Sequence, residues 1–229
     1  MLQLENKNKI YIYFFFFLIL STITNYNFSN FFIKKFKIKQ IHVFGLNNEQ
    51  NNKIKYEIKK LNYKNIFLLN KNEVKKIIED NNLVEKYKVK LKYPDIVIVD
   101  ISKTTFIGKV YSLDEKYLIG SNGKKIKVSD FNSTDNIPIV SGDVVINEYI
   151  KFVKKIQKSN LKLKDIERLH YHKIKRWDIK TKNGFLIMLP QENIHKKLSI
   201  AYKLILNNIP KDFNRIDLRI KNKVTISYE

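Results

Sequence analysis

Apolar residues are concentrated near the start of the chain, where residues 10–33 contain no charged side chain. Residues 10–20 are almost wholly apolar, whereas residues 21–30 mix Ser, Thr and Asn with aromatic residues. A helix over the whole uncharged run would be about 36 Å long, which exceeds the hydrocarbon thickness of a bilayer. The pattern predicts a transmembrane helix near residues 10–26, followed by aromatic residues in the interfacial region.

Two other interpretations of this segment stay open. A cleaved signal peptide has a similar apolar stretch, but no A-x-A-like cleavage site follows it here. A buried helix of a soluble domain is the second alternative, although four consecutive Phe at residues 14–17 would be unusual there. Charge alone does not fix the orientation, because four Lys at residues 34–39 outnumber the two before residue 10.

In residues 36–103, some apolar residues recur with the spacing typical of a strand and others with the spacing typical of a helix. Ile41 and Val43 alternate with polar residues up to Gly45, which predicts a short strand. Two apolar stripes at helical spacing follow, and Asn70 stands at N-cap spacing before the second. The expected order is β-α-α-β-β: a strand to Gly45, a helix carrying Ile54, Ile58 and Leu61, an extended run at residues 65–70, a helix carrying Val74, Ile77 and Ile78, and strands at residues 87–91 and 96–101.

Residues 104–229 are mainly strand-like, with turn signals between the apolar runs. Asn122-Gly123 and Asn183-Gly184 are hairpin signals. Asp143 is expected to cap one helix, which carries Ile146, Ile150 and Val153. The expected strands are 117–126 as a hairpin, 137–142, 164–171, 175–181, 185–190, 215–220 and 223–228, with a second helix around residues 194–205.

The net charge of +22 does not by itself indicate a nucleic-acid-binding protein. Only four of the 44 basic residues are Arg, the residue preferred for bidentate phosphate and base contacts. Lys is spread evenly and accompanied by Asn, Ile, Tyr and Phe, which share A/T-rich codons. Compositional drift is therefore the preferred explanation, and attraction to anionic lipid is a secondary expectation.

Residues with catalytic chemistry are sparse. The chain has no Cys, which excludes disulfides, thiolate nucleophiles and Cys-bound metals. His170-x-His172 would place two rings on one strand face, but no third ligand stands at metal spacing. Trp177, the one Trp, is expected to pack in the core. The sequence therefore predicts no catalytic residue, cofactor or metal, and a protein that is not an enzyme.

Several stretches resemble the FtsQ/DivIB family of cell-division proteins. I-H-V-F-G at residues 41–45, N-I-F-L-L-N at 65–70 and P-D-I-V-I-V-D-I at 94–101 are similar to its FtsQ-type POTRA domain. K-R-W-D-I followed by N-G and L-P at residues 175–190 looks like the family's R-R-W-D-L stretch, and I-D-L-R at 216–219 looks like the motif before its last strand. The family's Glu-Arg-x-Pro-x-Ala-like stretch after the POTRA domain is replaced here by residues 102–108.

The resemblance implies an α+β fold: an N-terminal transmembrane helix, a small POTRA domain, and a mainly antiparallel β domain with two helices. The domains expected are a cytoplasmic tail at residues 1–9, an anchor and interface at 10–33, the POTRA domain at 36–103 and the β domain at 104–229. It also implies a single-pass protein of the inner membrane with a periplasmic body. Its role would be a divisome scaffold at the septum that binds FtsB/FtsL-like proteins and the lipid bilayer, but no nucleic acid and no small-molecule substrate.

The last strand is the expected partner-binding site. A meandering sheet that ends at its final strand leaves a row of unpaired backbone groups, to which another chain can add a strand. The residues expected to serve are Val224, Thr225, Ile226, Ser227 and Tyr228. The resemblance assigns the terminal aromatic contact to Tyr228 and offers the edge of the POTRA sheet as a second binding surface.

Two alternative functions stay open. The first is a POTRA-bearing outer-membrane assembly or secretion factor that chaperones other chains. The second is a membrane-tethered nucleic-acid binder, which salt-dependent retention of DNA would reveal. The predicted helices in the C-terminal half argue against the first, and the even spread of Lys argues against the second.

Overall fold

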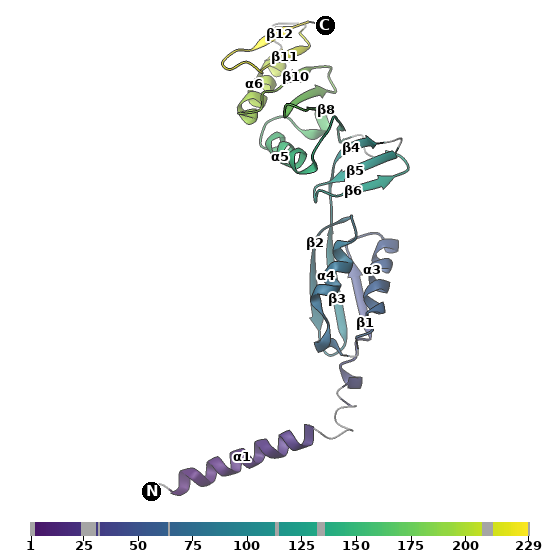
Figure 1. Ribbon diagram of the computed structural model, residues 1–229, viewed down its shortest axis with the longest axis vertical. Coiled ribbons are helices and arrows are strands. Elements are labelled where there is room, and N and C mark those ends of the chain that lie inside the picture. The colour runs from purple at the N-terminus through teal and green to yellow at the C-terminus, as the bar shows by residue number, and fades with distance from the viewer. Residues whose placement is uncertain are drawn as a thin grey trace. The chain divides into compact units, whose positions relative to one another are not determined.

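The computed structural model describes residues 3–23, 31, 33–63, 65–112, 115–131, 136–207 and 213–228 of the 229-residue chain. The chain divides into two compact units, Met1–Lys103 and Thr104–Glu229 (Figure 1).

The first helix, α1 (Gln3–Ile23), contains most of the apolar N-terminal run, and its side chains from Ile10 to Leu20 are exposed. In the described ranges, no helix is both long enough and apolar enough to cross a bilayer. The anchor predicted at residues 10–33 thus has no support there, and residues 24–30 and 32 lie outside the described part.

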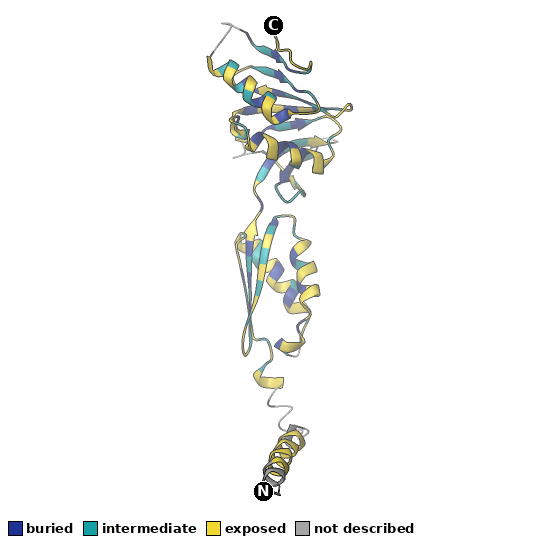
Figure 2. Cartoon of the chain, turned by 90° about the vertical axis from the view of Figure 1, so that its left-hand side faces the viewer, coloured by how far each residue is buried: buried dark blue, intermediate teal, exposed yellow. Residues whose placement is uncertain are grey.

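A three-stranded sheet with two helices on one face forms the body of the first unit (Figures 1 and 2). The strand order is β1-β3-β2, with β1 parallel and β2 antiparallel to the central β3. Its elements are β1 (Gln40–Phe44), α3 (Asn48–Lys60), η1 (Ile66–Leu68), α4 (Lys71–Glu79), β2 (Val84–Lys92) and β3 (Ile96–Lys103). The predicted β-α-α-β-β order is confirmed, except that residues 66–68 form a 3₁₀ turn rather than an extended run.

Local side-chain hydrogen bonds fix the ends of these elements. The side chain of Asn47 accepts a hydrogen bond from the Gln50 N–H (2.9 Å), and that of Asn70 accepts one from the Asn72 N–H (3.0 Å). These bonds satisfy amides that the first helical turn leaves without a partner. The N-cap predicted at Asn70 is therefore confirmed.

The second unit is built on one nine-stranded sheet in the order β12-β11-β10-β9-β8-β7-β4-β5-β6. Side chains of α5 and α6 share one core with the sheet and cover one of its faces (Figure 2). The elements are β4 (Phe106–Ser112), β5 (Glu115–Gly120), β6 (Lys125–Val128), β7 (Ile139–Ser141), α5 (Ile146–Gln157), η2 (Leu163–Asp165), β8 (Ile166–His172), β9 (Arg176–Thr181), β10 (Leu186–Met188), α6 (Ile194–Asn207), β11 (Arg215–Asp217) and β12 (Thr225–Ser227).

Trp177 lies at the centre of this core, as predicted, and is 4% exposed. Its ring stacks on Phe152 of α5 with 4.4 Å between centroids, and Tyr171 of β8 lies 4.7 Å away. Tyr149, also on α5, is fully buried, donates its hydroxyl hydrogen to the Ile107 carbonyl, and has a pKa raised by burial. The aromatic cluster therefore joins α5 to strands on both sides of β7.

Two predicted details of the second unit are wrong. Asp143 does not cap α5: the helix starts at Ile146, and its N-cap, Val145, makes no side-chain capping bond. Asp143 is instead the central residue of a tight turn, in which the Val144 N–H donates to the Gly142 carbonyl (2.8 Å), and it lies too far before Ile146 to cap the helix. The strands predicted at 137–142, 185–190, 215–220 and 223–228 are also shorter than predicted, since β7, β10, β11 and β12 have three residues each.

We expect Gly142→Ala to destabilise the second unit much more than Gly184→Ala. Both glycines have positive φ, +93° and +88°, which costs an L-residue about 1–2 kcal/mol. A Cβ on Gly142 would also lie 2.1 Å from the Tyr171 carbonyl oxygen, whereas one on Gly184 has no atom within 4 Å. Gly142→Ala should therefore lower the free energy of unfolding by at least about 2 kcal/mol more than Gly184→Ala does, as measured by urea unfolding followed by circular dichroism. Equal losses would contradict this account.

Candidate partner-binding site

The strand β12 forms one edge of the nine-stranded sheet. It pairs antiparallel with β11 in the register Arg215↔Ser227, Ile216↔Ile226 and Asp217↔Thr225. Within the described part of the chain, no strand pairs with the other side of β12. An edge of this kind presents backbone N–H and C=O groups to which a strand from another chain can add.

The predicted site residues divide into inward and exposed positions. Thr225, Ile226 and Ser227 make up β12, with Val224 before it and Tyr228 after it. Ile226 is half-buried and packs against the core, opposite the fully buried Ile216. Strand alternation places Val224 and Tyr228 on the same face as Ile226, and they are 38% and 61% exposed. The edge therefore combines an anchored centre with exposed apolar side chains on each side.

An ion pair fixes the chain where it leaves β11. Arg219 Nε lies 2.8 Å and 2.9 Å from the two carboxylate oxygens of Asp217, and the Arg219 N–H donates to one of them at 3.0 Å. Because Arg219 donates these hydrogen bonds, the pKa of Asp217 lies below its ordinary value. The turn that follows has Asn222 at φ +58°, and the Lys223 N–H donates to the Ile220 carbonyl (3.3 Å). This geometry returns the chain as β12.

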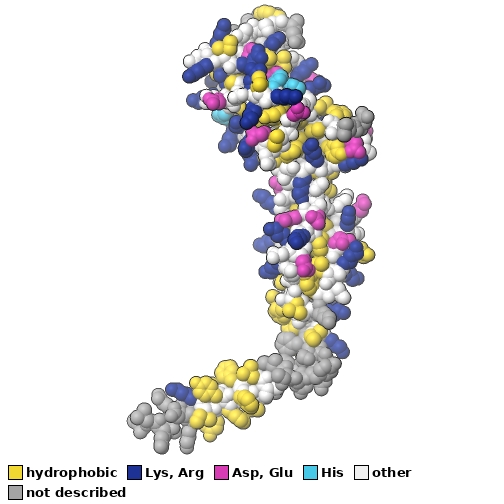
Figure 3. Space-filling model, viewed as in Figure 1, with side chains coloured by type: hydrophobic (Ala, Val, Ile, Leu, Met, Phe, Trp, Pro, Cys, Tyr) yellow, Lys and Arg dark blue, Asp and Glu magenta, His cyan; other side chains and the backbone are white. Residues whose placement is uncertain are grey.

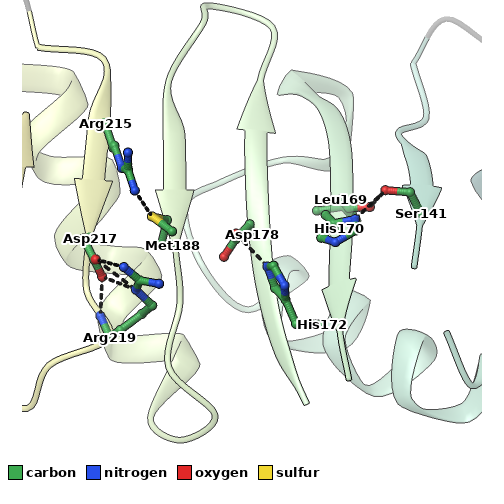
Figure 4. Close-up of polar contacts among 9 residues, drawn as sticks. All are labelled: Ser141, Leu169, His170, His172, Asp178, Met188, Arg215, Asp217 and Arg219. Carbon is green, nitrogen blue, oxygen red and sulfur yellow. Dashed lines mark hydrogen bonds and ion pairs between the residues drawn. The ribbon is translucent and has the colours of Figure 1, made fainter. Parts of the chain in front are cut away.

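Polar side chains line the sheet face opposite the helices (Figure 4). His170 and His172 lie side by side on β8, with 4.6 Å between ring centroids. The Nδ1 of His170 is 2.9 Å from the Ser141 hydroxyl, and the Nε2 of His172 is 2.7 Å from Asp178. These contacts orient both rings, and no group of three His, Asp or Glu residues among those described is placed to hold a metal.

A basic cavity of about 420 Å³ lies beside the connection from β11 to β12. Its lining includes four cationic side chains and one carboxylate: Arg176, Lys197, Arg219, Lys221 and Glu192. The Nε of Arg176 is buried and has no hydrogen-bond partner among the described groups. Lys197 donates to the Ile220 carbonyl at 3.4 Å, and Arg219 is held by Asp217. The cavity therefore favours an anionic group near Arg176.

Sequence reasoning did not find this cavity. Its residues come from β9, residues 190–193, α6 and residues 218–221, which only the folded sheet brings together. The scarcity of Arg was one available signal, because Arg176 and Arg219 are two of only four.

The three-stranded sheet of the first unit has β1 and β2 at its edges. Exposed Lys alternate with partly buried residues along β2. Lys90 forms an ion pair with Asp100 (2.6 Å) across the face opposite the helices. This edge stays a second candidate for binding a partner.

Two family models match the chain. Residues 36–103 match the model "POTRA domain, FtsQ-type", and residues 110–219 match "Cell division protein FtsQ/DivIB, C-terminal". A solved structure, the major extracytoplasmic domain of the trans isomer of the cell-division protein DivIB from Geobacillus stearothermophilus, is 16% identical with a TM-score of 0.35. That match covers 48% of this chain and 99% of the other. No curated protein matches the chain.

We expect Asp217→Asn to loosen the β11–β12 connection at pH 7 but not in acid. A carboxyl group whose folded-state pKa is lowered stabilises the fold above its unfolded pKa of about 3.9 and loses that contribution as the pH falls further. The variant should therefore lose about 1 kcal/mol of local stability at pH 7. The difference in local stability between the variant and the unmodified chain should become smaller below about pH 4.

Amide hydrogen exchange in residues 215–228, corrected for its intrinsic pH dependence, measures this effect. Asp143→Asn is the matched control, because Asp143 is exposed and lies 3.9 Å from Lys173. If Asp217→Asn and Asp143→Asn show the same amide exchange rates in residues 215–228 at pH 7, the Asp217–Arg219 ion pair has no role in holding this edge.

Proposed function

Because this chain belongs to the FtsQ/DivIB family of non-catalytic bacterial cell-division proteins, we propose that it is a membrane-tethered scaffold of the division machinery. In this proposal it performs no chemistry of its own and recruits partner proteins to the division septum. The observation that carries the proposal is the open side of β12 at the end of the nine-stranded sheet.

Strand addition is the proposed mode of recruitment. A partner segment would extend the sheet beyond β12, with main-chain hydrogen bonds supplying affinity and alternate side chains supplying specificity. Val224 and Tyr228 offer exposed apolar surface to it, while Ile226 holds the strand on the core. Tyr is one of the residue types that most often supply binding energy when they are buried in a protein interface.

The proposed partners are FtsB/FtsL-like division proteins, which the family resemblance suggests. The basic cavity beside the edge adds a chemical criterion: a partner strand with a carboxylate near its end could place that group against Arg176. Arg favours this arrangement because its planar guanidinium binds carboxylates in a bidentate manner. A POTRA-type assembly or secretion chaperone is less well supported, because the C-terminal half matches the division family rather than a chaperone.

The proposed location is the inner membrane, with the N-terminus in the cytoplasm and the body in the periplasm. The uncharged run at residues 10–33 supports an anchor by its length and hydropathy.

We expect Ile226→Pro and Tyr228→Asp to reduce partner binding at least about tenfold. Proline removes a backbone donor and fixes φ in the edge strand, and the aspartate places a charge on an apolar contact. Copurification of division proteins with the full chain from membranes, quantified by mass spectrometry, measures this. Deleting residues 223–229 should have the same effect.

Matched controls lie elsewhere in the second unit. Ile126→Pro changes β6, the opposite edge of the same sheet, and Tyr111→Asp changes an exposed Tyr on β4. Circular dichroism should show that all variants keep the fold. Normal binding by folded Ile226→Pro and Tyr228→Asp proteins would refute strand addition at β12.

We expect the anchor to depend on residues 10–20. Phe16→Lys with Leu18→Lys places two charges in the apolar run, each costing about 2.5–3.5 kcal/mol at the centre of a bilayer. The unmodified chain should resist carbonate extraction from membranes, and the double variant should be extracted. Ile174→Lys, at an exposed position of the second unit, is the control and should stay in the membrane. A shortened N-terminus found by mass spectrometry would instead indicate a cleaved signal peptide.

A further inference from the structure

Large apolar side chains are exposed together at one end of the first unit. The rings of Phe36, Phe67 and Tyr93 form a row, with 5.0 Å between the centroids of each neighbouring pair. Leu68 adjoins Phe67 and is 69% exposed, while Phe67 and Tyr93 are 58% and 54% exposed. We call Phe36, Phe67, Leu68 and Tyr93 the apolar cluster. Figure 3 shows hydrophobic side chains gathered at this end of the unit.

Phe36 is partly buried and packs against the core of the unit, whereas Phe67, Leu68 and Tyr93 are exposed. Within the same short segment, Ile66 and Leu69 point inward and are fully or almost fully buried. The 3₁₀ turn η1 begins at Ile66 and ends just before Leu69, and its other two residues, Phe67 and Leu68, are exposed. The Asn65 side chain accepts a hydrogen bond from the Phe67 N–H (2.8 Å), which fixes the turn. A fixed turn that exposes two large apolar residues indicates a contact outside the unit.

The cluster lies where the chain enters the unit. The Ile66 N–H donates to the Phe36 carbonyl (2.8 Å), and the Lys39 N–H donates to the Asp95 carbonyl (2.9 Å). These bonds hold η1 and the β2–β3 turn beside the segment that leads into β1. Phe36 is only three residues from Ile33, the end of the uncharged run, so at most about 11 Å of chain separates them.

We propose that the apolar cluster docks into the headgroup region of a bilayer that contains anionic lipid. The inference rests on the proposed anchor, because the short connection would hold Phe36 at the membrane surface whenever residues 10–33 are in the bilayer. Tyr is suited to this region because its ring meets lipid while its hydroxyl meets water, and Phe and Leu add apolar surface that can be buried at the headgroup boundary.

Charge favours lipid over a protein partner as the occupant. Exposed Lys residues flank the cluster in sequence: Lys35 and Lys37 around Phe36, Lys71 after Leu68, and Lys92 before Tyr93. The neighbouring Asp95 forms an ion pair with Lys39 (3.0 Å). Apolar residues surrounded by Lys are typical of surfaces that bind anionic membranes. Docking would restrict rotation of the unit about its tether and so fix which of its edges faces partners.

Site-specific labelling of the full chain tests the proposal, because the natural sequence has no Cys. Leu68→Cys carries an environment-sensitive fluorophore, and the protein is reconstituted in vesicles with or without phosphatidylglycerol. Phe44→Cys, exposed at the far end of β1, is the matched control. Flotation of the vesicles measures anchoring separately from docking.

We expect quencher-bearing lipids to reduce emission from position 68 about twofold in anionic vesicles and to leave position 44 unchanged. Adding Phe67→Ser and Tyr93→Ser should abolish quenching at position 68, whereas adding Tyr56→Ser, an exposed residue on α3, should not. Flotation should stay complete in all of these variants.

Three results would overturn the docking proposal. Complete flotation with no quenching at position 68 would leave the anchor intact and reject the docking. A blue-shifted emission without lipid quenching would assign the cluster to a protein contact instead. Failure to float would reject the anchor and the docking together.

Discussion

Backbone N–H and C=O groups in a sheet need partners, and a strand at the end of a sheet finds them on one side only. In the second unit β12 is in this position, with β11 on one side and no described strand on the other. Three paired residues are a weak attachment by themselves. The packing of Ile226 on the core and the Asp217–Arg219 ion pair keep the strand in place. The proposed function depends on this balance, since the edge must be held firmly enough to act as a template.

The rest of the second unit supports that edge. Trp177, stacked on Phe152, ties α5 to β9, and the buried hydroxyl of Tyr149 ties the same helix to β4. One continuous core therefore extends from β4 to Ile226, and both helices lie on one face of the sheet. The opposite face is polar, with oriented His and Asp side chains rather than an apolar patch. The contacts of His170, His172 and Asp178 on that face lie within the chain, whereas β12 has an open side in the described part of the sheet.

Features set by local spacing were predictable from the sequence, and features set by distant residues were not. Alternation and turn signals predicted the order of the three-stranded unit, the cap at Asn70 and the buried position of Trp177. The cap predicted at Asp143 is wrong because a tight turn at Gly142 intervenes before α5. The basic cavity around Arg176 joins four separate segments, and the outward side chains of η1 depend on which neighbours fill the core. Partner binding by Val224–Tyr228 stays a prediction.

Lys and Arg are distributed differently along the chain, which helps to distinguish charge that reflects composition from charge that could serve in recognition. Lys occurs throughout the chain, and a biased composition explains its overall abundance. The four Arg do not follow that pattern, since all of them lie within residues 168–219, on β8, β9, β11 and the turn after β11. Arg219 already makes a bidentate contact with a carboxylate, and Arg176 has a buried Nε with no described partner. Because Lys cannot reproduce planar, two-pronged binding, Arg would be retained in a Lys-rich protein where that geometry is needed. By this reasoning, the Arg side chains with a candidate role in recognition are Arg176 and Arg219, in the cavity beside the connection from β11 to β12.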